Sequence, residues 1–390
     1  AVVGYDHASG RVSSLTDRHG AQWSVGAPVL GEYTQQITLE WPGRREITYS
    51  YDMKQGGRLT QRAEVPVGSD KPAVRHWSYN EETGFLELVV DENDNAVAYE
   101  TDDRGNVIAE TRCVDAGDDP LEGDSSCYTT YFEYYYDAED VLDPRNDVLV
   151  WSADPRSANR NDTTYRTTRT LDEAGRAIQI TYPKPAGQST NPTESFTFTT
   201  TADGVPGLLK QHVARNGGVT TYTYTSAGDL ATVTDPAGLV TTYTYDNLGR
   251  RVSVNRSATV NGQVVDYGTT TTVYNELSQP VEVTETGVTN QVNSVTHTRR
   301  TTSTYDPETG WLTQITVSDL TGGDADRTTT FEYDSRGRLT TTTNPDGTVV
   351  TQTWDEAGDI VATSLPGLTT VYTYDHGHRL LTATAQGAGV

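Results

Sequence analysis

Aromatic or apolar residues alternate with polar ones along much of this chain. In residues 240–254 the rings of Tyr243 and Tyr245 alternate with Thr242 and Thr244. Side chains two positions apart share one face of a β-strand, so this alternation predicts a strand with an aromatic face and a threonine face. A Pro-Ala-Gly stretch precedes the run and an Asp-Asn-Leu-Gly stretch interrupts it, which predicts short strands separated by tight turns.

The same run recurs about a dozen times, at intervals of roughly 20 to 30 residues, from one end of the chain to the other. A second turn, often of Pro-x-Gly type, falls midway between copies. Strands joined by such turns pair antiparallel, so the predicted fold class is all-β, an array of antiparallel β-hairpins. We expect one continuous repeat region over residues 1–390, with irregular insertions at about 106–170 and 183–220.

The residue types within each copy are those of a turn. The aspartate can accept hydrogen bonds from backbone N–H groups two residues on, and the glycine can adopt a positive φ. Asn80 and Asn275 replace the aspartate, while Phe85 and Trp311 replace the arginine that follows the glycine. So many equivalent acids cannot all be catalytic, and we predict no catalytic, cofactor-binding or metal-binding residue among them. The predicted structural turn residues are Tyr5, Asp6, Gly10, Tyr51, Asp52, Tyr245, Asp246, Gly249, Tyr305, Asp306, Gly310, Tyr333, Asp334, Gly337, Trp354, Asp355, Gly358, Tyr374 and Asp375.

Composition supports a sheet without a thick aliphatic core. Only 34% of the 390 residues are hydrophobic, with 23 Tyr against 5 Phe. Tyr, Thr and Val suit a pleated, half-buried surface. Apolar runs such as Leu86–Val90 are too short to span a bilayer as a helix.

The formal net charge of −25 excludes nucleic acid as a natural partner, because the phosphate backbone would be repelled. Cys113 and Cys127 flank the loop 114–126 and border strand-like sequence on both sides, which predicts a disulfide and an oxidising compartment. The alternative is two separate free thiols. The chain opens inside a repeat without a signal peptide, so we expect a segment of a longer protein.

Together, the recurring Tyr-x-Tyr-Asp-x-x-Gly-Arg-Leu-Thr motifs resemble those of the YD-repeat or Rhs (rearrangement hotspot) family. This family includes bacterial Rhs toxins, wall-associated YD proteins, toxin-complex B and C components and teneurins. The strongest matches are Tyr5-Asp6, Tyr51-Asp52, Tyr245-Asp246, Tyr305-Asp306, Tyr333-Asp334 and Tyr374-Asp375. The resemblance implies hairpins that spiral into a curved sheet or hollow shell, which in bacterial members holds a C-terminal toxin. It also suggests a self-cleaving site at Asp235, in "DPAGL", but we interpret Asp235 as a turn residue.

Two stretches of the sequence offer possible metal ligands but also fit turns. Asp91, Asn93, Asn95 and Asp102 have part of the spacing of a calcium loop, although Ala96 stands where that loop needs glycine. A turn between two strands fits better, with calcium left open. Asp375, His376 and His378 offer possible zinc ligands, but we expect them at exposed positions of an ordinary repeat turn.

The predicted function is a non-catalytic shell or scaffold of a secreted or cell-surface protein, without cofactors, that encloses or presents a C-terminal toxin or other cargo polypeptide. The alternative is an adhesion or carbohydrate-binding scaffold of teneurin or wall-associated type, with cell-surface glycans as partners. Its candidate stacking residues lie outside the motif: Trp23, Trp41, Trp77 and Trp151. We expect packing as their likelier use. A polysaccharide-acting enzyme is a distant third, since no pair among the 54 acids stands out.

Overall fold

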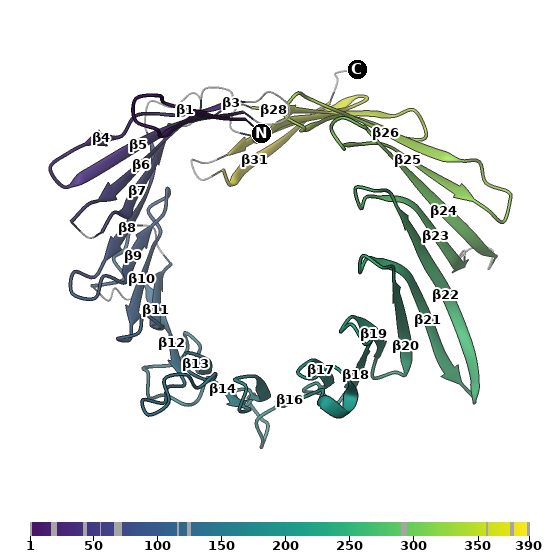
Figure 1. Cartoon of the computed structure of the whole chain (residues 1–390), viewed down its shortest axis with the longest axis horizontal. Helices are drawn as coiled ribbons and strands as arrows, with labels where there is room; N and C mark the ends of the chain where they lie inside the picture. Colours follow the sequence, from purple (N-terminus) through teal and green to yellow (C-terminus); the bar gives the residue numbers. More distant parts are fainter. Residues whose placement is uncertain are drawn as a thin grey trace. The chain divides into compact units, whose positions relative to one another are not determined.

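A computed structural model describes residues 2–16, 22–41, 45–54, 56–65, 72–114, 117–122, 126–289, 295–355, 358–374 and 378–387. These residues form β-strands, turns and a single 3₁₀ turn at Thr201–Asp203 (Figure 1). They contain no helix long and apolar enough to cross a membrane. The chain divides into two compact units, unit 1 (Ala1–Phe132, Ala153–Asn161 and Phe331–Val390) and unit 2 (Glu133–Ser152 and Asp162–Thr330).

Unit 1 holds two runs of strands. The first is β1 Val2–Tyr5, β2 Val12–Thr16, β3 Gln22–Val25, β4 Val29–Leu30, β5 Thr34–Trp41, β6 Arg45–Asp52, β7 Arg58–Glu64, β8 Ala73–Tyr79, β9 Leu86–Val90, β10 Ala96–Thr101, β11 Val107–Cys113 and most of β12 Cys127–Tyr134. The second is β27 Leu339–Thr343, β28 Val349–Trp354, β29 Ile360–Leu365, β30 Leu368–Tyr374 and β31 Leu380–Gly387.

Unit 2 holds the strands between these runs. They are most of β13 Leu149–Ala153, β14 Arg166–Leu171, β15 Ala177–Thr181, β16 Thr193–Phe198, β17 Leu209–Val213, β18 Val219–Tyr224, β19 Leu230–Thr234, β20 Leu239–Tyr245, β21 Arg251–Val260, β22 Gln263–Tyr274, β23 Pro280–Thr289, β24 Thr296–Tyr305, β25 Leu312–Asp319 and most of β26 Arg327–Tyr333.

Within each unit, strands that follow one another in the chain pair antiparallel, as neighbouring ribbons show (Figure 1). One exception lies near the start of the chain, where β3 and β4 both pair with β5. The strand β3 pairs with the end of β5, at Leu39 and Glu40, and β4 pairs with its beginning, at Gln35 and Gln36. The predicted fold class, an all-β array of antiparallel hairpins, is confirmed.

The hairpins carry little apolar core. Among the described residues, the fully buried apolar side chains are Ile47, Ala73, Ala98, Ala109 and Ala153. Most other strand residues are half-buried, in keeping with the low aliphatic content of the sequence. Stability therefore depends on backbone pairing and on contacts between neighbouring strands more than on a packed interior.

Candidate functional site

The Asp246 copy shows how a repeat turn is built. The backbone N–H of Asp246 donates to the Arg250 carbonyl at 2.9 Å, and that of Gly249 donates to the Asp246 carbonyl at 3.0 Å. Asp246 Oδ1 accepts from the backbone N–H groups of Leu248 and Arg250 at 2.9 and 3.0 Å. Gly249 has a φ of 74°. This is a type I turn followed by a left-handed residue, which makes a bulge where the strand resumes.

Other copies repeat this geometry. Asp102, Asp172, Asp334 and Asn275 each accept backbone N–H groups two and four residues on. The turns that begin at Asp6, Asn80 and Asp306 are one residue longer, and a serine or threonine hydroxyl also donates to the acid or amide. Asp52 and Asp355 likewise accept N–H groups from their own turns.

These bonds explain the direction of the carboxyl pKa values. Hydrogen bonds from the Ser9 side chain and backbone lower the pKa of Asp6, and those from Thr309 lower the pKa of Asp306. At Asp246, desolvation acts to raise the pKa, but the Arg250 backbone and side chain outweigh it and the pKa is lowered. The turn acids are thus held as hydrogen-bond acceptors, the opposite of the raised pKa that a general acid needs at neutral pH.

In seven of the described repeats the aromatic residue bonds to the preceding repeat. The Tyr245 hydroxyl donates to the Leu230 carbonyl at 2.9 Å, and Trp354 Nε1 donates to the Leu339 carbonyl at 2.7 Å. The acceptor is in each case the residue that resumes the strand after the preceding turn. Equivalent bonds run from Tyr79 to Leu59, Tyr224 to Leu209, Tyr274 to Arg251, Tyr305 to Pro280 and Tyr374 to Ile360.

The aromatic residue also marks a β-bulge. The register shifts between Thr244 and Tyr245 and between Thr353 and Trp354, and in the same place in other copies, including Tyr5, Tyr51, Tyr305 and Tyr374. A bulge leaves backbone groups outside the regular ladder. The side-chain N–H or O–H donor reaches a backbone carbonyl at this point, so each turn is tied to the strand beside it.

The arginine that follows the glycine reaches forward to the next repeat. Arg338 Nε donates to Asp334 Oδ2 at 2.7 Å, and its Nη1 donates to the Asp355 carbonyl of the next turn at 2.7 Å. The Arg338 guanidinium also lies 5.6 Å from the centre of the Trp354 ring. Arg250 makes the same three contacts with Asp246, the Asn275 carbonyl and Tyr274. Arg250 and Arg338 therefore each close their own turn and contact the next.

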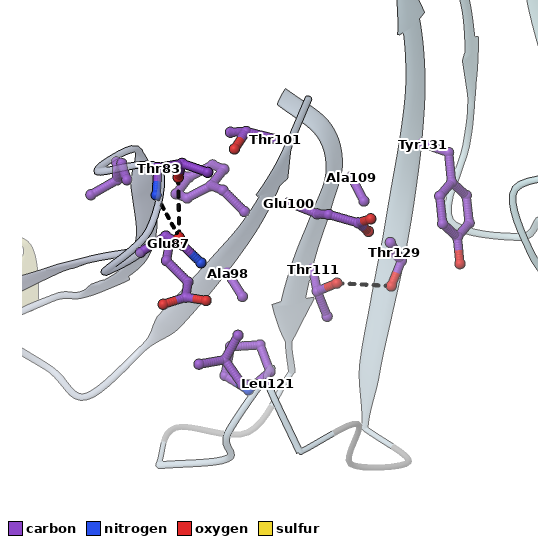
Figure 2. Close-up of a pocket in the computed structure, with 14 residues that line it drawn as sticks. Thr83, Glu87, Ala98, Glu100, Thr101, Ala109, Thr111, Leu121, Thr129 and Tyr131 are labelled. Atoms are coloured by element: carbon purple, nitrogen blue, oxygen red, sulfur yellow. Dashed lines mark hydrogen bonds between the residues drawn. The ribbon is translucent and has the colours of Figure 1, made fainter. Parts of the chain in front are cut away.

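A polar groove of about 420 Å³ lies over β9, β10, β11 and β12 (Figure 2). Cys113 and Cys127 form a disulfide between the paired ends of β11 and β12, and the loop they close brings Pro120 and Leu121 to the groove. Glu87 and Glu100 also line it. No histidine, lysine or arginine is found among the described residues that line this groove, so its charged groups are the two carboxylates.

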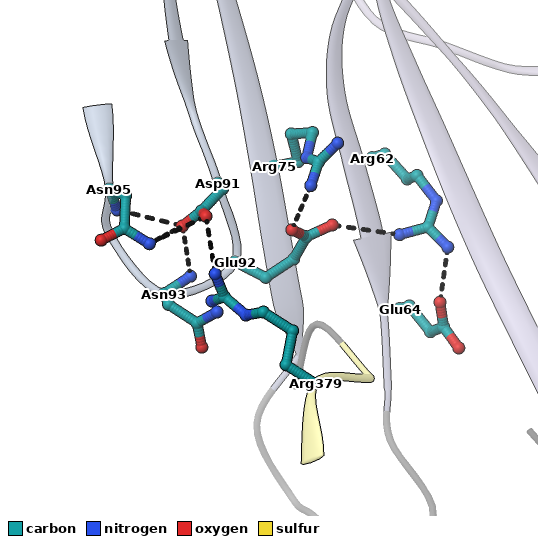
Figure 3. A network of polar contacts seen from close by, with 8 residues as sticks. All are labelled: Arg62, Glu64, Arg75, Asp91, Glu92, Asn93, Asn95 and Arg379. Atoms are coloured by element: carbon teal, nitrogen blue, oxygen red, sulfur yellow. Dashed lines mark hydrogen bonds and ion pairs between the residues drawn. The ribbon is translucent and has the colours of Figure 1, made fainter. Parts of the chain in front are cut away.

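A charged cluster lies elsewhere in unit 1 (Figure 3). Arg62 bridges Glu64 and Glu92, at 2.6 and 3.3 Å. Arg75 bonds Glu92 at 2.8 Å. The Glu64 and Glu92 side chains are only 4% and 7% exposed, so the arginines are needed to compensate two buried carboxylates. Sequence reasoning missed this cluster, because its members are distant in the chain and outside the motif.

Part of the chain matches a known family model. The RHS Repeat model matches residues 207–238, 224–260 and 320–349. This chain contains RHS repeats. The predicted relationship to the YD-repeat or Rhs family is thereby confirmed. The search of curated proteins found no match.

Solved structures share the fold of this RHS-repeat chain. TcdB2-TccC3 without its hypervariable C-terminal region is 16% identical, with a TM-score of 0.60 over 97% of this chain and 22% of that chain. TcdB2-TccC3-Cdc42 is 15% identical, with a TM-score of 0.58 over 99% of this chain and 23% of that chain. The RHS-repeat chain thus spans less than a quarter of the length of these relatives, and at such identities the likeness concerns the fold alone.

The structure places the candidate metal ligands of the RHS-repeat chain in separate turns. Asp91 closes the β9–β10 turn by accepting from the Asn93 and Asn95 backbone, whereas Asp102 closes the β10–β11 turn. A strand separates them, so the calcium-loop hypothesis is wrong. No group of three metal-binding side chains occurs among the described residues. Asp235 closes an ordinary turn by accepting from the backbone of Ala237 and Leu239.

The zinc hypothesis falls largely outside the described residues, because Asp375 and His376 lie there. His378 is described, and it is half-buried instead of exposed as predicted. Its Nδ1 lies 2.7 Å from Asp359 Oδ2, and its Nε2 lies 3.6 Å from Glu64 Oε1. With a φ of 61°, it occupies the position that glycine holds in most repeats.

The tryptophans outside the motif do not form one exposed platform in the described part of the chain. Trp23, Trp77 and Trp151 are half-buried, and the side chain of Trp41 is not described. The Arg166 guanidinium covers the Trp151 ring at 3.9 Å. This arrangement favours packing over sugar stacking.

Proposed function

We propose that this chain is a wall segment of an Rhs-type shell, which encloses or presents another polypeptide of the same protein and has no chemistry of its own. One observation carries the proposal. Side chains of the repeat turns bond the neighbouring repeat, backward through aromatic residues such as Tyr245 and Trp354, and forward through Arg250 and Arg338. The motif residues thereby link the repeats into a wall, and their polar groups are used in the hydrogen bonds that form these links.

The comparisons support the same function. The fold likeness is to toxin-complex proteins, one of which is described as lacking its hypervariable C-terminal region. A variable region next to a constant shell fits a cargo polypeptide that is exchanged while the wall is kept. We extend this arrangement to the present chain as its partner: a C-terminal toxin or other cargo of the same protein.

Threonine-rich strand faces suit an enclosed, hydrated space. Thr111 and Thr129 share a side-chain hydrogen bond of 2.9 Å between β11 and β12, and Thr316 and Thr328 share one of 3.1 Å between β25 and β26. A hydroxyl-covered sheet presents little apolar surface, so a cargo segment is held without tight hydrophobic binding. The disulfide and the net charge of −25 support a secreted or cell-surface location.

Protease protection in the natural full-length protein tests the proposal. We expect the segment outside the repeats to resist protease while the shell is intact, and to be degraded once acid or denaturant opens it. The same segment made alone serves as the control and should be degraded at once. Equal digestion of the segment in the intact protein and alone would contradict enclosure.

A further inference from the structure

The turn before β31 contacts strands near the opposite end of the sequence. Arg379 Nη1 lies 3.5 Å from Asp91 Oδ2 in the β9–β10 turn, as Figure 3 shows. His378 Nε2 lies 3.6 Å from Glu64 Oε1 on β7. These contacts join residues more than 280 positions apart, within unit 1.

The receiving side is a prearranged acidic surface. Glu64 and Glu92 are held nearly buried by Arg62 and Arg75, and Asp91 is fixed by the hydrogen bonds of its own turn. Asp91 accepts these bonds with one carboxylate oxygen and also bonds the Asn95 side chain with the other. These acids are already fixed by their own partners, so the contact with the turn before β31 costs little further side-chain conformational entropy.

The incoming turn is shaped by a residue that is unusual at its position. His378 has a left-handed backbone, φ 61°, where most repeats have glycine. Its Nδ1 lies 2.7 Å from Asp359 Oδ2 in the preceding repeat turn, which fixes the imidazole between Asp359 and Glu64.

We infer that His378 and Arg379 form a polar latch, which holds the last described hairpin, β30–β31, against Glu64 and Asp91. The latch is independent of what the repeats enclose. The Arg379–Asp91 ion pair is partly exposed, so salt weakens it. When it opens, the hairpin is left joined to unit 1 mainly through β29, with which β30 pairs.

Hydrogen exchange of the peptides from residues 368–387 measures latch opening. In the unmodified chain, we expect exchange to be about three- to tenfold faster in 1 M than in 0.1 M NaCl, because the partly exposed Arg379–Asp91 pair is screened. Arg379→Glu should show the fast rate already at 0.1 M, with little further response to salt. Arg11→Glu is the matched control, since Arg11 follows the glycine of the opening repeat and its side chain has no ion pair among the described residues.

A second variant separates the latch from backbone strain. His378→Gly relaxes the left-handed backbone and removes both imidazole contacts, so the latch predicts faster exchange of residues 368–387. If only strain mattered, the same change would slow exchange. Asn261→Gly, at another left-handed position, φ 51°, should leave exchange of residues 368–387 unchanged.

Should Arg379→Glu fail to fold, the salt response of the unmodified chain and the exchange of His378→Gly still test the latch. Exchange that is insensitive to salt and to both latch variants would overturn the latch.

Discussion

Each turn acid uses its oxygens inside its own repeat. Asp246 and Asp334 accept two backbone N–H groups with one oxygen and an arginine Nε with the other. This local role could be predicted from the sequence, because an Asx-turn needs only residues within four positions of one another. Of the predicted turn residues, the aromatic ones and Asp52 lie at the ends of strands, and the other described acids and the glycines lie in the separate turns that follow. Asp375 lies outside the described residues.

The turn acids give the chain a stability that depends on pH. The pKa values of Asp6, Asp246, Asp306 and Asp334 are all lowered in the folded chain. Their contribution is complete above the unfolded aspartate pKa of about 3.9, and it is lost as the pH falls through the lower folded values. Urea unfolding should therefore show a constant free energy of unfolding near neutral pH and a decrease from about pH 4 downward. A free energy that rises on acidification would refute this role.

Glycine at the end of the turn is required by its backbone. Gly249→Ala places a Cβ on a residue with φ 74°, and we expect a loss of about 1–2 kcal/mol in the free energy of unfolding. Asp94 occupies the same position of its turn with φ 61°, and it is exposed. Asp94→Gly should therefore be neutral or stabilising. Thermal unfolding of both variants checks this, and equal losses for the two would contradict it.

At the scale of the element, the repeat is a turn tied to its neighbours. The sequence predicted which residues share a face, but not the acceptor of each tyrosine hydroxyl, which lies 14 to 25 residues away. The forward contacts of Arg250 and Arg338 were likewise not predicted, since the motif alone does not say which side chains reach the next turn. His378 was predicted to be exposed, but its contacts with Asp359 and Glu64, which the motif does not specify, leave it half-buried.

The hydroxyl bond between repeats can be measured in one strand. Tyr245→Phe removes the donor to the Leu230 carbonyl and should lower the free energy of unfolding by about 1 kcal/mol. Tyr243, two positions earlier on β20, is the matched control, because its hydroxyl has no hydrogen bond among the described residues. Tyr243→Phe should cost less. An equal or larger loss for Tyr243→Phe would show that the bond from the Tyr245 hydroxyl does not link the repeats.

The disulfide stabilises the loop over the groove. It joins two cysteines that are 14 positions apart in the sequence, on β11 and β12. A loop of this size predicts a contribution of roughly 3 kcal/mol from restriction of the unfolded chain. Thermal unfolding with and without reductant should show a lower midpoint after reduction, and Cys113→Ser with Cys127→Ser should reproduce it. An unchanged midpoint would contradict the stabilising role.

For the whole molecule, the sequence predicted the class of architecture from periodicity, since every repeat follows the same rule. The proposals of one continuous region and of a closed shell concern the relation between distant repeats, which no local pattern specifies. The latch illustrates the difference: Glu64, Asp91 and Arg379 belong to no common motif, and only the fold brings them together.

The central claim is that aromatic–acid turns tie successive hairpins into a wall around another polypeptide. An electron cryomicroscopy map of the natural full-length protein tests it most directly. The account predicts hairpins linked turn to turn, with the Tyr245 hydroxyl on the Leu230 carbonyl, and a lumen that contains density from residues outside the repeats. A map in which the repeats leave no lumen, or in which the turn acids converge on a bound ligand, would contradict it.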